Sequence, residues 1–182
     1  VPRFYQNLYN KISLNFSKQK GFKKKLIEKT IILGTKKLNN EKFSFKEKIY
    51  NFLCEKLVRR KIKNQFGGKL IAFVSGGGAL DKKIGEFLNS IGLPTLQGYG
   101  LTETSPVVSC NIPGKIRIDT VGPPFKTNQV KIAEDGEILV KGENVMLGYW
   151  NMKKETEEIL KNGWLYTGDI GEITGEGNLR IT

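Results

Sequence analysis

The chain has 182 residues, of which 38% are hydrophobic and 26% are charged, a composition typical of a folded globular protein. This length supports one domain with a hydrophobic core and argues against two complete domains. The sequence contains no histidine, which excludes Ser-His and Cys-His nucleophile arrangements and His-ligated metal sites.

The positive charge is concentrated near the N-terminus. Residues 1–65 carry 18 Lys and Arg against 4 Asp and Glu, whereas residues 66–182 carry 12 against 14, which gives the net charge of +12. Such a basic region is either a solvated lysine-rich face or a surface that binds nucleic acid or anionic lipid. The aromatic residues among the lysines recur at helical spacing, which favours a core-facing stripe over a base-stacking platform, so we expect no nucleic-acid partner.

The cysteines and apolar runs bear on location. Cys54 and Cys110 lie far apart and form no metal-binding or disulfide pattern, so we expect a reducing compartment, the cytoplasm. The apolar runs at 30–33 and 70–74 are far shorter than the roughly 18 residues needed to span a bilayer. We see no signal-peptide pattern.

Residues 1–66 are predicted to form basic helices. The first is indicated by apolar residues at helical spacing: Phe4, Tyr5, Leu8, Tyr9, Ile12 and Phe16. Ser44 and Glu47 have the spacing of a capping box at the start of a later helix. The apolar residues of that helix fall on one face: Ile49, Phe52, Leu53 and Leu57.

Residues 67–110 are predicted to form a βαβ unit. Segment 69–75 reads as a short, fully buried strand, followed by a glycine-rich turn at 76–78. Asp81 would cap the next helix, and segment 95–100 gives a second strand. The connection of about twenty residues predicts that the two strands are parallel. The apolar face of the helix is expected to comprise Ile84, Phe87, Leu88 and Ile91.

Residues 111–182 are predicted to be rich in β-strands. Short strand-like runs alternate with Gly, Pro, Asn and Asp-Gly turn signals, which indicates a meander or a small barrel-like sheet. One short helix is expected around residues 155–160. The predicted fold class is therefore α/β, with helices first, a βαβ unit next and a β-rich segment last.

Two glycine-rich segments follow predicted strand ends, where α/β folds place ligands. In the turn at 76–78, glycines would let a ligand approach the backbone, and amides at the helix start could donate to it. A plain tight turn is the alternative for this segment. In segment 97–106, Gly98 and Gly100 would free the backbone around Tyr99.

The same segment carries the side chains best suited to a nucleotide. Thr102 and Thr104 offer hydroxyls for phosphate oxygens, and Glu103 offers a hard oxygen ligand suited to Mg²⁺. Two glycine-rich ends of neighbouring strands would form one crevice, whose natural occupant is a nucleotide with Mg²⁺.

A third candidate is Asp169. Gly163, Gly168 and Gly171 surround this residue and would place it in a tight turn. Its carboxylate could accept two hydrogen bonds from a vicinal diol such as a ribose. A role in the turn alone is the alternative.

Five motifs occur in an order that resembles the adenylate-forming (AMP-binding) superfamily: SGGGAL, QGYGLTETSP, VGPPF, GEILVKGENVMLGYW and GWLYTGDIGEI. Within it, the opening VPRFYQNLYNKI and the segment GENVMLGYWN are similar to the long-chain fatty acid–CoA ligases. The resemblance covers nearly the whole chain. It implies part of the large N-terminal domain of an enzyme that uses ATP, Mg²⁺ and coenzyme A to convert a fatty acid into an acyl-adenylate and then a thioester.

The resemblance also implies residue roles. Glu103 would bind Mg²⁺ and Thr102 would contact the AMP phosphate, which makes these two the candidate catalytic residues. Asp169 would hold the ribose hydroxyls, and Tyr99 would lie against the adenine. Further nucleotide contacts are expected from Gly77, Gly78, Ala79, Gln97, Gly98 and Gly100.

Two parts of the family's machinery are expected outside this chain: the phosphate-binding loop, and the C-terminal domain with its adenylation lysine. Segments 1–66, 67–110 and 111–182 would then form one incomplete AMP-binding domain, and we expect no turnover by the chain alone.

Alternatives are another adenylate-forming enzyme, of the peptide-synthetase or luciferase type, and a non-catalytic binder of nucleic acid or membrane surfaces. The expected partners are small molecules, with a peripheral contact at the inner face of a membrane as a further expectation.

Overall fold

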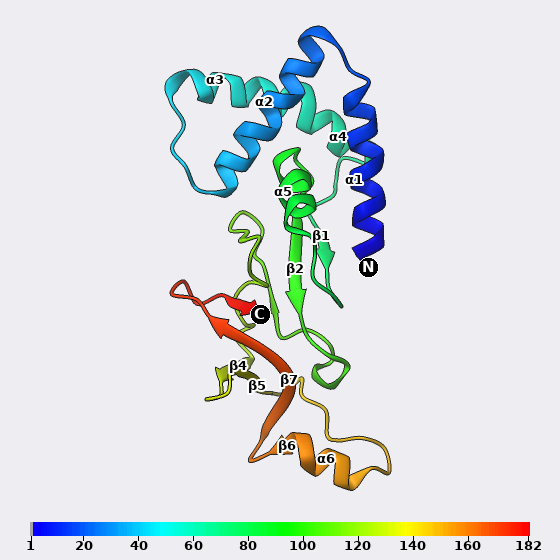
Figure 1. The fold of residues 1–182 in the computed structure, drawn as a ribbon, viewed down its shortest axis with the longest axis vertical. Coiled ribbons are helices and arrows are strands. Elements are labelled where there is room, and N and C mark those ends of the chain that lie inside the picture. The colour runs from blue at the N-terminus through cyan, green and yellow to red at the C-terminus, as the bar shows by residue number, and fades with distance from the viewer. Residues whose placement is uncertain (1) are drawn as a thin grey trace. The chain divides into compact units, whose positions relative to one another are not determined.

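The computed structural model describes residues 2–182, and the chain divides into two compact units, Val1–Thr95 and Leu96–Thr182 (Figure 1). Both helices and strands are present, so the predicted α/β class is confirmed. Within the described residues, no helix has the length and apolar character needed to cross a bilayer. The elements of the first unit are α1 (Pro2–Ser17), α2 (Gly21–Leu38), α3 (Phe45–Cys54), the π-helical turn η1 (Glu55–Arg59), α4 (Arg60–Gln65), β1 (Phe73–Ser75) and α5 (Lys82–Ser90).

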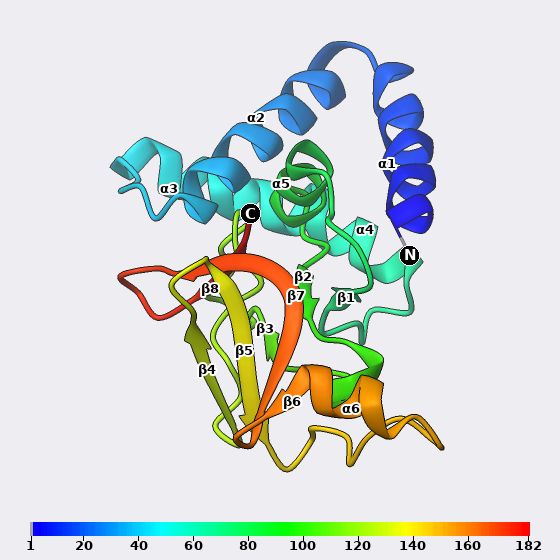
Figure 2. The same ribbon diagram turned by 60° about the horizontal axis from the view of Figure 1, so that its bottom comes forward.

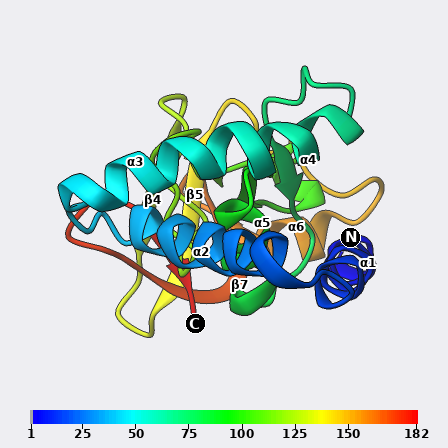
Figure 3. The same cartoon turned by 90° about the horizontal axis from the view of Figure 1, so that it is seen from above.

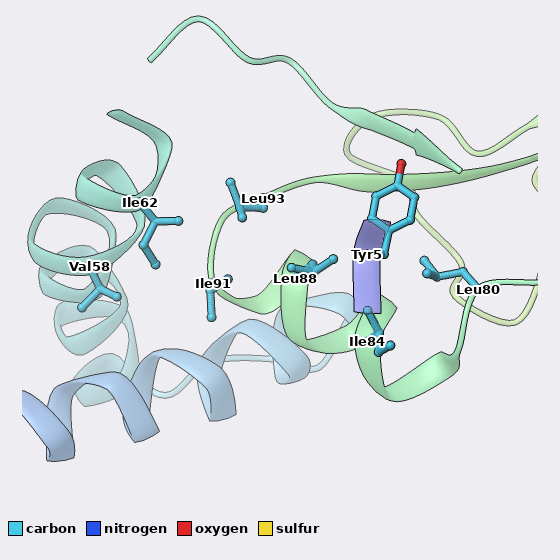
Figure 4. Close-up of a cluster of buried hydrophobic side chains, with 8 residues drawn as sticks. All are labelled: Tyr5, Val58, Ile62, Leu80, Ile84, Leu88, Ile91 and Leu93. Carbon is cyan, nitrogen blue, oxygen red and sulfur yellow. The ribbon is translucent and has the colours of Figure 1, made fainter. Parts of the chain in front are cut away.

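The core of the first unit is assembled around α5. This helix begins at the predicted cap, where the Ile84 amide donates to Asp81 Oδ1 at 3.1 Å. Its buried face is the predicted one, and it meets α1 through Tyr5, whose hydroxyl donates to the Val74 carbonyl oxygen at 2.8 Å. Figure 4 shows this cluster, which comprises Tyr5, Val58, Ile62, Leu80, Ile84, Leu88, Ile91 and Leu93.

Close packing joins α2 and α5. A Cβ atom at Gly34 would lie only 2.4 Å from the Ser90 Cα, so no larger residue fits between the two backbones without a shift. Beside this contact, the Arg59 side chain is 5% exposed. Its Nε donates to the Ser90 carbonyl at 2.9 Å and its Nη2 to the Thr30 carbonyl at 3.1 Å. Arg59 therefore ties η1 to both helices.

The predicted capping box begins α3. The Glu47 amide donates to the Ser44 hydroxyl at 3.3 Å, and the Ser44 amide donates to Glu47 Oε2 at 2.8 Å. This backbone bond, and then the Lys36 ammonium at 3.0 Å, lower the pKa of Glu47 to about 2. These polar contacts place Glu47 on the side of α3 that faces α2, and Figure 3 shows these two helices packed together.

The prediction of a core-facing aromatic stripe is wrong for α3. The helix turns Cys54 inward, so its apolar row points to solvent, with Phe45 79% and Phe52 57% exposed. The physical reason is that the inward contacts are polar ones, including the bond from Arg59 Nη1 to Asn51 Oδ1 at 2.8 Å. The exposed row, here called the α3 row, comprises Phe45, Ile49, Phe52, Leu53 and Leu57.

The prediction of a fully buried strand at 69–75 is also wrong. Regular strand structure is confined to β1, where Val74 is 59% exposed. One face of β1 packs against α1, with the rings of Tyr5 and Phe73 6.2 Å apart. Alternate side chains point to the opposite face, so a strand covered on one side buries only every second residue.

The second unit is an antiparallel sheet assembly. In Figure 2, β4, β5 and β7 lie side by side and α6 adjoins β6. The strand order is β4-β5-β7-β6, with β8 paired to β7, so the predicted meander is only partly present: β5 neighbours β7, and β6 lies on the far side of β7. The elements are β2 (Thr95–Tyr99, which begins one residue before the unit), η2 (Thr102–Thr104), β3 (Ser109–Cys110), β4 (Asn128–Ile132), β5 (Glu137–Gly142), α6 (Lys153–Ile159), β6 (Leu160–Lys161), β7 (Trp164–Ile173) and β8 (Leu179–Ile181).

Both faces of β5 are buried at its centre, where Ile138, Leu139 and Val140 follow one another in the strand. Val140 pairs with Val130 on β4 and with Leu165 on β7, and it is fully buried. Ile138, also fully buried, joins it in the small core of this unit together with Leu179. The predicted short helix is confirmed as α6.

Candidate functional site

Glu103 is presented by the tight 3₁₀ turn η2. The turn is fixed from within by Thr104, whose hydroxyl accepts from the Leu101 amide at 2.9 Å and donates to the Pro106 carbonyl at 2.7 Å. Thr104 is fully buried, so the prediction of a phosphate-binding hydroxyl there is wrong: its hydrogen bonds are used by the turn. Thr102, by contrast, is exposed.

The loop after β5 holds this turn from the other side. The Met146 amide donates to the Glu103 carbonyl at 2.8 Å, and Asn144 Nδ2 donates to the Thr104 carbonyl at 2.8 Å. The Tyr149 hydroxyl donates to Glu103 Oε1 at 2.6 Å. This bond lowers the pKa of Glu103 and raises the pKa of Tyr149, because it favours the ionised carboxylate and the protonated phenol.

Sequence reasoning missed Tyr149 as a site residue. The segment GENVMLGYWN was identified only as a family motif, and nothing in its letters indicated contact with Glu103 across 46 positions. The one sequence feature that could have pointed to Tyr149 is its place in a family motif between two predicted strands.

Asp169 lies within β7 at a bulge, so the prediction that glycines place it in a tight turn is wrong. β5 and β7 pair at Leu139 with Tyr166 and at Glu137 with Ile170, so one residue of β5 lies opposite three of β7. The three, residues 167–169, bow out of the ladder. Bulges of this kind redirect side chains, and Asp169 is directed by one here.

The bulge is stabilised by its own side chains. The Thr167 hydroxyl donates to the Ile138 carbonyl at 2.7 Å and accepts from the Asp169 amide at 3.2 Å. Gly168 has a φ of +74°, which a residue with a Cβ rarely adopts. Its amide donates to Glu137 Oε1 at 2.7 Å.

Two predicted site residues meet at this bulge. The Tyr99 hydroxyl, at the end of β2, donates to Asp169 Oδ2 at 2.7 Å. Burial, followed by the bond to Asp169, raises the pKa of Tyr99 far above its ordinary value, so the phenol stays a hydrogen-bond donor. The structure therefore brings the predicted base-contacting ring and the predicted ribose carboxylate together.

A cavity of about 340 Å³ lies beside these groups, entirely within the second unit. Glu103 and Tyr149 form one part of its lining, and Thr167 and Gly168 of the bulge form another. The remaining lining residues are Leu101, Glu137, Glu158, Ile159, Lys161, Leu165 and Tyr166.

The other predicted nucleotide contacts have varied surroundings. Gly98 pairs with Cys110 in the ladder between β2 and β3, and Gln97 Nε2 donates to the Ile118 carbonyl at 2.6 Å. Gly100 is required by close approach, because a Cβ there would lie 1.7 Å from the Pro106 carbonyl oxygen. Gly98 and Gly100 therefore allow close packing of neighbouring groups, and neither adopts a left-handed backbone conformation. The predicted contacts Gly77, Gly78 and Ala79 belong to the first unit, in the exposed turn between β1 and α5.

The carboxylate oxygens of Glu103 suit a cation that is bound partly by the protein and partly by nucleotide phosphates. Over residues 2–182, no three His, Cys, Asp or Glu side chains come together as a metal-binding cluster. Mg²⁺ is commonly held by one or two carboxylates plus substrate phosphates, for which the single carboxylate of Glu103 at a cavity is sufficient.

These features define the class of the protein. Residues 1–150 match the family model of AMP-binding enzymes, and the chain belongs to that family.

Curated relatives match the whole chain. The long-chain-fatty-acid–CoA ligase FadD15 of Mycobacterium bovis is 34% identical over 183 residues, covering 100% of this chain and 30% of its own length. Long chain acyl-CoA synthetase 5 of Arabidopsis thaliana is 30% identical over 196 residues, covering 100% of this chain and 29% of its own length. The chain therefore spans less than a third of these relatives.

Solved structures share the fold. The o-succinylbenzoate CoA synthetase MenE of Bacillus subtilis, bound to a product analogue, superposes with a TM-score of 0.58 at 33% identity, covering 62% of this chain and 25% of that one. MenE in complex with AMP gives a TM-score of 0.55 at 29% identity, covering 67% and 29%. The predicted fold and family are confirmed.

Proposed function

We propose that this chain is part of an enzyme that activates a long-chain fatty acid with ATP and transfers the acyl group to coenzyme A. One observation carries the proposal: the Tyr99–Asp169 pair and the Glu103 turn belong to one unit, and both Glu103 and the Asp169 bulge contribute to the lining of its cavity. The names of the relatives that span the whole chain support a long-chain acid as the substrate.

The proposed reaction has two steps. A carboxylate oxygen of the acid bonds to the α-phosphorus of ATP while the bond to pyrophosphate breaks. The sulfur of coenzyme A then bonds to the acyl carbon, its proton is lost and AMP leaves. The attacking carboxylate is already ionised, so the first step needs no general base, and the absence of histidine is no obstacle.

The residues of this chain would bind and orient the nucleotide. Asp169 would accept hydrogen bonds from the ribose hydroxyls, Tyr99 would place its ring against adenine, and Thr102 would contact the AMP phosphate. Residue chemistry and family resemblance support these roles.

Glu103 would hold Mg²⁺ together with the nucleotide phosphates. When bound, the metal offsets the negative charge that develops on the α-phosphate. The residue is suited to this role because η2 and the loop after β5 fix its backbone, and because its side chain lines the cavity.

The test is ATP–pyrophosphate exchange in a complete ligase that carries this segment. Exchange should depend on a long-chain fatty acid and not on an aromatic acid. Glu103→Gln should lower it by about 10²–10³-fold, the typical loss for one such electrostatic contact. Glu143→Gln, which changes an exposed glutamate on the loop after β5, is the matched control. A Glu103→Gln rate close to the parent rate would refute the metal assignment, and dependence on the aromatic acid would refute the substrate. The chain alone should give no exchange above background.

We also propose that the first unit makes a peripheral contact with an anionic membrane surface, consistent with the expected cytoplasmic location. The α3 row is exposed, and lysines adjoin it, with Lys56 Nζ 4.6 Å from the Phe52 ring centroid. Basic helices with an exposed apolar face bind anionic interfaces through both features.

A further inference from the structure

Tyr149 contacts Glu103 at the cavity wall in a way that leaves the carboxylate accessible. Its hydroxyl donates to Oε1 at 2.6 Å, a bond that engages one of the two carboxylate oxygens. Both side chains line the same cavity of about 340 Å³. A neutral donor placed this way restricts the rotation of the carboxylate without neutralising it.

The main chain of the same loop completes the restraint. The Met146 amide donates to the Glu103 carbonyl at 2.8 Å. The loop therefore holds Glu103 at two points, one on its backbone and one at the end of its side chain. Two such contacts fix the direction in which the side chain points.

Tyr149 is itself held by α6. Its amide donates to the Thr156 hydroxyl at 2.9 Å, and that hydroxyl donates to the Met152 carbonyl at 2.8 Å. Gly148 permits the close approach, because a Cβ there would lie 2.7 Å from Thr156 Cγ2 and its φ is +150°. The position of the phenol thus depends on a helix rather than on a free loop.

The charge around the cavity suits a cation. Glu103, Glu137 and Glu158 contribute three carboxylates to the lining, and Lys161 contributes one ammonium. An acidic lining disfavours a bare anion and favours a nucleotide that arrives with its divalent cation.

We propose that Tyr149 is a positioning residue for the metal-binding carboxylate: its hydroxyl orients Glu103 toward the Mg²⁺ carried by the nucleotide. The inference rests on the proposed function. Hydrogen-bonding groups outside the ligand shell commonly set metal affinity in this way, and their loss typically costs 10–100-fold. Because Tyr149 is partly exposed to water, we expect the lower end of that range.

The experiment uses the 182-residue chain and Mn²⁺ as a spectroscopic probe for Mg²⁺. The electron paramagnetic resonance spectrum of the preformed Mn²⁺–ATP complex is followed as the chain is added, which gives the affinity of the chain for the metal-loaded nucleotide. ATP binding is measured separately by calorimetry in EDTA. Tyr149→Phe should weaken Mn²⁺ binding about 10-fold while metal-free ATP binding is unchanged. Glu103→Gln should weaken Mn²⁺ binding further.

The matched control is Tyr50→Phe, which removes a hydroxyl from an exposed tyrosine outside the cavity and should bind Mn²⁺ like the parent. Thermal unfolding of each variant checks that the fold is retained. Equal Mn²⁺ affinity of the parent and Tyr149→Phe chains would overturn this inference and leave the Glu103 site standing. No Mn²⁺ binding by the parent, or parental binding by Glu103→Gln, would overturn the proposed metal site and this inference with it.

Discussion

Polar side chains form hydrogen bonds to different kinds of partner in the two units. In the first unit, the Tyr5 hydroxyl donates to a backbone carbonyl and Arg59 donates to two more, so polar groups fasten helices together. In the second unit, Tyr99 and Tyr149 each donate to a carboxylate, at 2.7 and 2.6 Å. Hydrogen bonds to backbone groups join elements of the fold, whereas the two tyrosine–carboxylate pairs orient charged side chains at the candidate site. The comparison shows that a tyrosine hydroxyl has a different structural effect according to whether its partner is a backbone carbonyl or a carboxylate.

The largest expected effect breaks the packing of the first unit. Arg59→Ala removes the donors to Ser90 and Thr30 and leaves a cavity between three helices. We expect it to lower the free energy of unfolding by about 3 kcal/mol. Urea unfolding measures this, with the exposed neighbour Arg60→Ala as a control that should cost little. A loss below about 1 kcal/mol would mean that Arg59 does not fasten the helices.

A smaller effect sharpens the functional side of the comparison. Tyr99→Phe keeps the ring but removes the hydroxyl that holds Asp169. We expect AMP to bind about fivefold more weakly, the value of one hydrogen bond, while 2′-deoxy-AMP is affected less. Calorimetry with both nucleotides gives the ratio. If Tyr99→Phe weakens both equally, the hydroxyl does not serve the ribose site.

The smallest effect concerns the exposed α3 row. Phe52→Ser removes a half-exposed ring, and we expect binding to vesicles of anionic lipid to fall about threefold, because burial of part of such a ring contributes less than about 1 kcal/mol. Sedimentation with anionic and zwitterionic vesicles measures it. Parent chain that binds both vesicle types equally, or neither, would argue against the proposed membrane contact.

Local signals predicted the elements well. The capping box at Ser44 and the cap at Asp81 are both present, because each depends on residues only three positions apart. The orientation of the apolar row of α3 toward solvent was not predictable from the sequence. The residues of α3 that face inward are set by partners on other helices, such as Lys36, which pairs with Glu47. Periodicity identifies an apolar face but not the neighbour that covers it.

The candidate site was predicted in composition but not in contacts. Glycines around Asp169 indicated a turn, whereas the structure uses Gly168 for a bulge inside one strand. The distinction depends on the register between β5 and β7, which sequence periodicity cannot supply. In the sequence, Thr102 and Thr104 are equally good candidates for a phosphate-binding hydroxyl. Only the fold shows that the Thr104 hydroxyl is already hydrogen-bonded within its own turn.

The bulge in β7 has a further consequence for how such a site can be built or changed. The bulge gives β7 two more residues than β5 has opposite it. Because two is an even number, side chains beyond the bulge point to the same faces of the sheet as they do before it. Leu165 before the bulge and Gly171 after it are both buried. A surplus of one would turn every later side chain over. The segment that carries Asp169 is therefore a module that can be lengthened or shortened in pairs, which lets the carboxylate be redesigned while the sheet beneath keeps its hydrophobic face.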